Sequence, residues 1–197
     1  MIPFPLHSCF LALPLEGKPR EIFEDIQKKL SSFSQILLFQ NPLSPHLTLY
    51  FWEEVMTIEW KQIVKHAENI ASRSIPFVIS VTGAETFGSH GRDHTLFLSV
   101  AFCEELAHIK KMCPWPNVKP FAPHITLARI DHPEHFCIQK KRIMKILKNI
   151  SFDVPVDRLR LYADIDGKKQ TPLQGFPFSR KSKNTNVMVR DGQPVSW

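Results

Sequence analysis

The pattern Pro-His-aliphatic-Thr-Leu occurs twice in this chain, as PHLTL at residues 45–49 and as PHITL at residues 123–127. Four fixed letters recur at one given position with a probability on the order of 10⁻⁵ to 10⁻⁶, so a chance second copy anywhere in such a chain has odds of roughly one in a thousand. The repeat therefore indicates that two parts of the chain are built around the same short segment.

Each copy has the alternation of a β-strand with one polar face. Residues two apart on a strand project from the same face, so histidine and threonine point one way and the aliphatic residue between them points into the core. The alternation in the first copy gives two sets of residues, with Leu47, Leu49 and Phe51 facing the core and His46, Thr48 and Tyr50 facing the other way. In the second copy His124 and Thr126 form the corresponding polar pair.

The two halves of the chain also show the same order of elements. The first half predicts a strand, a helix after Pro19, the motif strand, a helix capped by Thr57 and another strand, at residues 9–15, 19–33, 46–52, 57–71 and 76–87. The second half predicts the same series at residues 94–102, 103–112, 123–130, 133–150 and 152–164. We therefore expect an α+β, bilobal fold in which two antiparallel sheets line a central cleft, with helices outside and the motif strands side by side.

These repeats, about 9–87 and 94–164, are expected to form one bilobal domain over residues 1–178. The Gly-rich loop GSHGRD at 88–93 is the best candidate for a boundary or hinge between them. Residues 171–179 predict an edge strand, because prolines are tolerated there. Residues 179–197 are polar and without period, so we expect a tail with no function of its own.

Composition limits the cellular setting. The net charge of +6 favours anionic partners such as nucleic acid, although only weakly. The four cysteines form no zinc-type spacing, so we expect buried free thiols in a reducing cytoplasm. The first residues lack an early Lys or Arg and contain Pro3, Pro5 and Pro14, which fits neither a signal peptide nor a membrane span. We expect a cytoplasmic monomer that makes no membrane contact.

Two imidazoles and two hydroxyls that face one gap suit a substrate that needs one proton removed and another supplied, and a phosphodiester is such a substrate. Histidine fits both tasks, because its pKa of about 6.5 allows either charge state near pH 7. Thr48 and Thr126 would donate hydrogen bonds to the non-bridging phosphate oxygens. A single His-x-Thr strand is more often structural, but the duplication favours catalysis. A zinc site ranks lower, because Thr is a poor ligand and neither strand offers a second nearby ligand.

Several nearby residues are open to two interpretations. Arg129 follows His124 by five positions, an odd offset that points it away from His124 in a regular strand. It can bind phosphate if a bulge or its long side chain brings it round, and otherwise it is a surface charge. Phe121 either stacks on a base or belongs to the core. Three residues in and beside the Gly-rich loop either contact a phosphate or are ordinary solvated loop residues: His90, Arg92 and His94.

The paired motifs, their spacing of 78 residues and the opening FLALPL at 10–15 resemble the 2H phosphoesterase superfamily, in particular its RNA 2′,3′-cyclic phosphodiesterase branch, historically called 2′-5′ RNA ligase. The resemblance spans about residues 8–178. It implies a bilobal α+β fold, no metal cofactor, and an RNA or oligonucleotide substrate with a 2′,3′-cyclic phosphate end that is hydrolysed to a 2′-phosphate, with 2′-5′ ligation as a possible reverse reaction.

The resemblance also implies roles for individual residues. By position His46 matches the general acid at the leaving oxygen, and His124 matches the general base for water. Thr48 and Thr126 match the phosphate-holding threonines, and Arg129 matches an arginine that is common after the second motif. Relatives usually carry an Arg where this chain has Ser8, and they often continue the first motif as Phe-Leu-Gly where this chain has Phe51-Trp52-Glu53. The substrate preference therefore stays open.

Two other hypotheses remain. The same site would also suit 2′-5′-linked oligoadenylate, ADP-ribose cyclic phosphate or a cyclic nucleotide signal, and a panel of trimmed substrates separates these. A non-catalytic RNA- or nucleotide-binding module is the third possibility. Tight binding without turnover would identify it.

Overall fold

The structure is a computed structural model that describes residues 2–116 and 120–179. The strands are β1 (Leu6–Pro14), β2 (Leu37–Phe39), β3 (His46–Val55), β4 (Phe77–Ser89), β5 (Arg92–Val100), β6 (His124–Ile130), β7 (Phe152–Val156), β8 (Arg158–Ile165) and β9 (Lys168–Pro177). The helices are α1 (Lys18–Lys29), α2 (Thr57–Arg73), α3 (Glu104–Met112) and α4 (Pro133–Ile146), with a 3₁₀ turn at Ser31–Phe33. Of the expected tail, all but its first residue lies outside the described residues.

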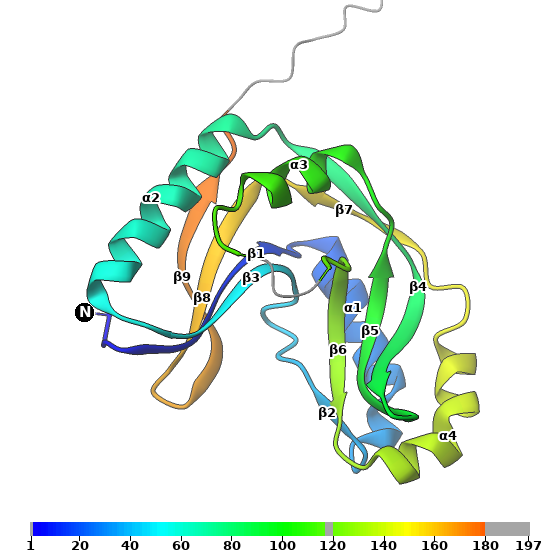
Figure 1. The fold of residues 1–197 in the computed structure, drawn as a ribbon. Coiled ribbons are helices and arrows are strands. Elements are labelled where there is room, and N and C mark those ends of the chain that lie inside the picture. The colour runs from blue at the N-terminus through cyan, green and yellow to red at the C-terminus, as the bar shows by residue number, and fades with distance from the viewer. Residues whose placement is uncertain (1, 117–119, 180–197) are drawn as a thin grey trace, which may run out of the picture.

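The strands form one curled sheet in the order β7-β4-β5-β6-β3-β1-β8-β9, with β2 paired to β6 (Figure 1). The pairs are antiparallel, and the two wings of the sheet meet where Leu47 of β3 lies opposite Ile125 of β6. Helix α2 packs against β8 and β9, whereas α1 packs against β7 and α4 against β5. The expected α+β fold with antiparallel strands, outer helices and adjacent motif strands is confirmed, except that the two expected sheets are joined by the pairing of β3 with β6 into one.

Each half of the sequence also contributes a strand to the wing that holds the other half's motif strand, β4 in one direction and β8 in the other. Strand β4 follows α2 in the chain but pairs with β5 and β7, and β8 pairs with β1. The single strand predicted at 152–164 is therefore wrong, because β7 ends at Val156 and β8 starts at Arg158 in the other wing. The alternation of buried and exposed residues changes phase here: Val154 and Val156 are buried in β7, Asp157 and Arg158 are not, and the next buried residues are Leu159 and Leu161. The apolar residues of the sequence shift in the same way, and the prediction overlooked this signal.

The boundary or hinge predicted at 88–93 is also wrong, because this segment is a tight hairpin between β4 and β5. Ser89 lies opposite Arg92 as the last pair of the ladder. His90 and Gly91 between them have φ angles of 52° and 76°. Two consecutive left-handed residues are typical of the type I′ turn that joins antiparallel strands. The glycines thus marked a turn within one sheet.

Three helices differ from the prediction at an end or at a cap. Helix α1 ends at Lys29 rather than at residue 33, and the 3₁₀ turn at Ser31–Phe33 follows it. Helix α4 ends at Ile146 rather than at residue 150, before Asn149 takes a left-handed φ of 65°. Helix α2 starts at Thr57, but Thr57 is not its cap. The preceding residue, Met56, occupies that position and donates its backbone N–H to the carboxylate of Glu59 at 2.8 Å.

The core lies between the sheet and the helices. It includes Leu47, Leu49, Ile125 and Leu127 of the motif strands, none more than 2% exposed. The opposite side of the sheet, which we call the open face, carries a separate small apolar cluster of Phe10, Ala12 and Tyr162. The four cysteines form no disulfide, but only Cys9 and Cys113 are buried, so the prediction of buried thiols holds for two of them.

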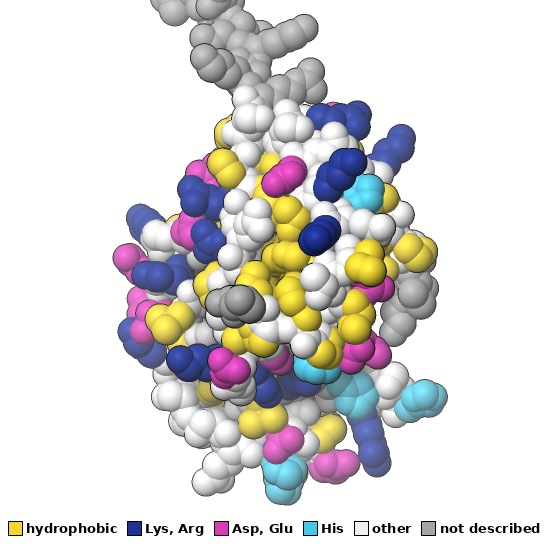
Figure 2. Space-filling view, turned by 90° about the vertical axis from the view of Figure 1, so that its left-hand side faces the viewer, with side chains coloured by type: hydrophobic (Ala, Val, Ile, Leu, Met, Phe, Trp, Pro, Cys, Tyr) yellow, Lys and Arg dark blue, Asp and Glu magenta, His cyan; other side chains and the backbone are white. Residues whose placement is uncertain are grey.

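The surface seen from the left of Figure 1 is shown in Figure 2. Hydrophobic side chains gather in the middle of this side, and the Lys and Arg side chains around them are interspersed with Asp and Glu. The net positive charge is therefore not collected into one basic patch there. None of the helices that the structure describes is long and apolar enough to cross a membrane.

Candidate active site

The central contact of the site is the pairing of the two motif strands. Leu47 lies directly opposite Ile125, and both are fully buried. In an antiparallel pair, the residues on either side of this contact also face each other across the strands. His46 is thus placed across from Thr126, and Thr48 across from His124. The four polar side chains surround one point of the open face.

The histidines occupy diagonal corners of this arrangement. Diagonal neighbours across an antiparallel pair have their side-chain origins about 7–8 Å apart, a gap that long or aromatic side chains can span. His46 and His124 are only partly buried, as are the two threonines. A spacing of this size would accommodate one small group between the two rings and the two hydroxyls.

Both motif strands carry a β-bulge at the same position. The bulge residue is Leu49 in β3 and Leu127 in β6, because the two residues that flank each one lie opposite consecutive residues of the neighbouring strand. A bulge adds one residue to one strand and shifts the alternation of every side chain that follows it. The two halves therefore share an irregularity as well as a motif.

In β6 the bulge brings Arg129 onto the face of His124 and Thr126. The three residues lie opposite alternate residues of β5, which share a face: Thr95, Ser99 and Phe97 respectively. Arg129 is exposed, whereas Ala128 and Ile130 on either side of it are buried. The sequence had left open whether a bulge brings Arg129 onto the face of His124, and the structure contains that bulge.

In β3 the same shift corrects the predicted faces. His46, Thr48 and Phe51 lie opposite alternate residues of β1 and share a face: Pro14, Ala12 and Phe10. Phe51 is 50% exposed instead of facing the core. Tyr50 packs against Trp52 and Trp115, with ring centroids 4.7 and 5.3 Å away. Phe51 was missed as a site residue, although it follows its histidine by five positions, as Arg129 does.

The two imidazoles are held in the same way. The Nδ1 atom of His46 lies 2.7 Å from the carbonyl oxygen of Ser44, and that of His124 lies 2.8 Å from the carbonyl oxygen of Ala122. A carbonyl oxygen only accepts, so each Nδ1 carries the hydrogen and donates it. The Nε2 atom of each neutral ring is then a proton acceptor, and in the charged ring it becomes a donor.

The surroundings of the two rings differ. His46 packs against the stacked pair Phe10 and Tyr162, at centroid distances of 4.5 and 5.3 Å. Burial lowers the pKa of His46 to about 4, against the opposing effect of its hydrogen bond to Ser44, and the charge of His124 lowers it further. His124 meets the edges of Phe87 and Phe97 at 4.9 and 5.4 Å. His46 is therefore neutral near pH 7 in the free protein.

This pKa predicts an acid-sensitive fold. His46 has a pKa of about 4 in the folded protein and 6.5 as its ordinary value. Between these values the unfolded chain binds a proton that the folded chain does not, so we expect the free energy of unfolding to fall by about 3 kcal/mol as the pH drops from 6.5 to 4. Urea unfolding across this range should show a smaller slope with pH for His46→Asn than for the wild type. Equal slopes would contradict the assignment.

The other residues that the sequence left open lie outside this arrangement. Arg92 pairs with Glu134 at 3.7 Å, and His94 contacts Ser89 at 3.2 Å, both at the end of the β4–β5 hairpin. Phe121 is partly buried against the core. Across residues 2–116 and 120–179, no group of three or more His, Cys, Asp or Glu side chains could hold a metal ion.

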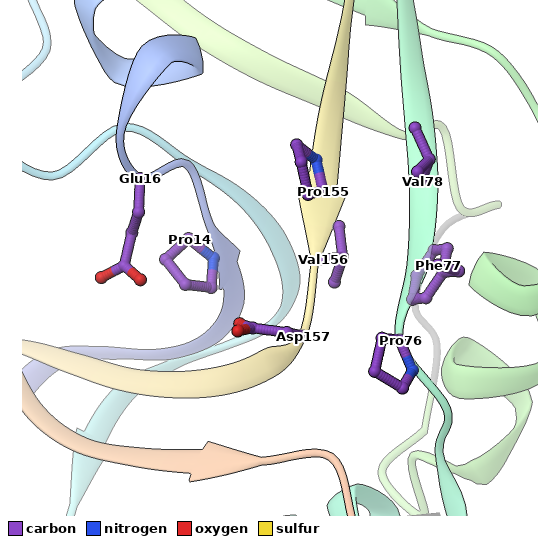
Figure 3. Close-up of a pocket in the computed structure, with 8 residues that line it drawn as sticks. All are labelled: Pro14, Glu16, Pro76, Phe77, Val78, Pro155, Val156 and Asp157. Carbon is purple, nitrogen blue, oxygen red and sulfur yellow. The ribbon is translucent and has the colours of Figure 1, made fainter. Parts of the chain in front are cut away.

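A separate groove of about 400 Å³ contains none of the motif residues. Figure 3 shows Pro14, Glu16 and Asp157 on one side of it and Pro76, Phe77 and Val78 on the other, with β7 between them. The carboxylates of Glu16 and Asp157 both lie near Arg158, at 3.6 and 2.8 Å from its Nε atom. The charges of this groove are thus already paired, and we place the candidate site on the open face instead.

The chain is similar in sequence to proteins of known function. Two curated relatives are named RNA 2′,3′-cyclic phosphodiesterase. The protein from Aquifex aeolicus is 28% identical over 99 residues, 45% of this chain and 53% of its own length. The protein from Methanothermobacter thermautotrophicus is 25% identical over 134 residues, 64% of this chain and 73% of its own. The match thus spans about half the length of the first relative and about three quarters of the second.

Two solved structures have the same fold. The protein TT0787 of Thermus thermophilus superposes with a TM-score of 0.68 at 22% identity, over 87% of this chain and 97% of that one. LigT of Escherichia coli complexed with 3′-AMP gives 0.63 at 22% identity, over 89% and 99%. The family model described as the 2′-5′ RNA ligase superfamily matches residues 17–168, most of the chain. The chain belongs to the 2′-5′ RNA ligase superfamily, a group of 2H phosphoesterases.

Proposed function

We propose that this protein hydrolyses the 2′,3′-cyclic phosphate at the end of an RNA to a 2′-phosphate, using His46 and His124 as a proton-transfer pair and no metal ion. The observation that carries the proposal is the arrangement around the Leu47–Ile125 contact, where two imidazoles held through their Nδ1 atoms and two threonines share one face. The names of the two curated relatives support the choice of substrate.

In the proposed reaction, one neutral imidazole takes a proton from water as the water oxygen attacks phosphorus. The bond from phosphorus to the 3′ oxygen breaks, and the other imidazole, in its charged form, donates a proton to that oxygen. Thr48 and Thr126 donate hydrogen bonds to the non-bridging oxygens, where charge resides in the transition state. The guanidinium of Arg129, on the same face, adds a positive charge beside them.

The family likeness gives His46 the role of acid and His124 the role of base, and we propose the same assignment. Because burial holds the pKa of His46 at about 4, this role requires the bound phosphate to raise that pKa. An anion within about 4–6 Å of an imidazole acts in that direction. The same pair would run the reaction in reverse with a ribose hydroxyl in place of water, so 2′-5′ ligation is a side activity in this proposal.

The substrate contact is proposed to be short. Near the histidines, Arg129 and the half-exposed Phe51 occupy equivalent positions, one suited to phosphate and the other to a base.

The protein is proposed to act as a monomer in the reducing cytoplasm, a compartment in which cysteines stay as free thiols. Burial raises the pKa of the Cys9 thiol to about 12 and that of the Cys113 thiol to about 11.

The direct test is product analysis on an RNA that ends in a 2′,3′-cyclic phosphate. We expect complete conversion to the 2′-phosphate in the presence of EDTA, because the proton transfers need only protein side chains. Phosphorus NMR distinguishes the 2′- from the 3′-phosphate. A cyclic end that persists, or a 3′-phosphate as the only product, would contradict the proposal. Turnover of small cyclic nucleotides in place of RNA would keep the chemistry and change the substrate.

A further inference from the structure

The backbone carbonyl groups of the two bulge residues accept hydrogen bonds from helix side chains. The carbonyl oxygen of Leu49 accepts a hydrogen bond from the Nζ atom of Lys110 at 2.7 Å. The carbonyl oxygen of Leu127 accepts one from the Nε2 atom of Gln27 at 3.1 Å. Each contact joins the bulge residue of a motif strand to one particular helix side chain, and the two contacts occur at equivalent places in the two halves.

The two contacts cross between the halves of the sequence. Gln27 belongs to α1, in the first half, and holds the motif strand of the second half. Lys110 belongs to α3, in the second half, and holds the motif strand of the first. The Gln27 contact links residues 100 positions apart in the sequence, and the Lys110 contact links residues 61 positions apart. A random surface contact does not explain this correspondence.

Both side chains are fixed by further neighbours. Gln27 is 7% exposed, and its amide also donates to the carbonyl oxygen of Gln40 at 3.0 Å. The ammonium of Lys110 lies 5.5 Å from the ring centre of Tyr50 and 5.2 Å from that of Phe121. The carbonyl oxygen of Leu127 also accepts the backbone N–H of Gln40 at 3.0 Å. Removing Gln27 would therefore take away one of two donors at that carbonyl, and removing Lys110 would take away the side-chain donor at the carbonyl of Leu49. The loss of a donor to a buried carbonyl costs more than the loss of an exposed hydrogen bond.

We propose that Lys110 and Gln27 are positioning residues of the active site, which act by holding the bulges at Leu49 and Leu127. A strand that loses its bulge returns to regular alternation, and a shift of one residue turns every following side chain to the opposite face. In β6 the residue affected is Arg129, and in β3 it is Phe51. The catalytic effect of this proposal rests on the proposed function, whereas its effect on the strands does not.

The test uses Lys110→Met and Gln27→Met, which keep the length of the side chain and remove the donor. Matched controls are Lys111→Met on the exposed side of α3 and Gln62→Met on the exposed side of α2. NMR should show Lys110→Met shifting the backbone amide signals of Thr48 and Phe51 and the methyl signal of Thr48, and leaving the corresponding signals of Thr126 and Arg129 in place. Gln27→Met should do the reverse, and the controls should shift neither set.

Activity gives the second readout. We expect each variant to lower kcat about 10- to 100-fold at a temperature where it is fully folded, since a displacement of 1 Å can cost about 10²-fold. Lys110→Arg keeps a donor and should restore most of the rate. Because Gln27 acts through Arg129, adding Gln27→Met to Arg129→Ala should cost less than the product of the two single losses, whereas Lys110→Met and Arg129→Ala should multiply.

Several outcomes overturn the proposal. Folded variants with unchanged signals for their own strand would do so, as would shifts of equal size in both strands. If Gln27→Met does not fold, Gln27→Asn shortens the side chain by one methylene and tests the same contact. A wild-type protein that is inactive on every substrate would refute the proposed function, and the NMR comparison would still decide whether the two residues hold the bulges.

Discussion

Replacing either His46 or His124 by alanine is expected to lower kcat on a cyclic-phosphate RNA by about 10²- to 10⁴-fold, because each change removes one of two proton-transfer groups. The rates should be measured at saturating substrate. Circular dichroism should verify that each variant is folded. His108→Ala is the matched control, because His108 is an exposed histidine on α3. Full activity in both motif variants would contradict the proposed pair.

A substrate with a better leaving group distinguishes the general acid from the general base. A p-nitrophenyl phosphodiester releases a weakly basic phenolate that needs little protonation, so an enzyme without its general acid loses much less on this substrate than on RNA. We expect His46→Ala to recover most of its lost rate on such an ester, whereas His124→Ala stays slow. Recovery in His124→Ala alone would reverse the assignment and would agree with the low pKa of His46 in the free protein.

The second large effect is expected from the threonines. Thr48→Val and Thr126→Val keep the volume and the strand preference of the side chain but remove its donor, and loss of one such donor to a transition-state oxygen costs about 10²- to 10³-fold in kcat. Steady-state kinetics should show the loss mainly in kcat, since the charge on these oxygens matters most in the transition state.

Thr82→Val provides the control for this pair, because Thr82 is exposed on β4 and away from the motif strands in sequence. It should change kcat by less than about twofold, in keeping with the small effects of most surface substitutions. A loss confined to KM in Thr48→Val and Thr126→Val would mean that the hydroxyls bind the ground state and the transition state equally.

Local patterns were sufficient for the elements and for the four central residues. Strand alternation is a property of the backbone, so the sequence alone placed His46 on one face with Thr48, and His124 on one face with Thr126. The structure adds the contact that joins the copies, Leu47 opposite Ile125. That pairing depends on how two distant strands meet, which no local pattern states.

The features that were not predicted are relations between strands. A bulge exists only relative to a partner strand, so neither the exposure of Phe51 nor the direction of Arg129 followed from alternation alone. The change of wing at Asp157 was overlooked because β7 and β8 each have strand periodicity, although the phase of that periodicity shifts between Val156 and Leu159. Lys110 and Gln27 gave no signal, because a lone polar residue on an amphipathic helix is ordinary. The equal offset of Phe51 and Arg129 from their histidines was a second available clue.

The measurement that bears most directly on the account is a titration of the protein with inorganic phosphate, followed by the ¹⁵N signals of the histidine rings. The account predicts that the Nε2 signals of His46 and His124 shift together, with one common Kd and one phosphate per protein. If only one ring responds, or if the two respond with different dissociation constants, the rings do not share a phosphate and the proposed site is wrong.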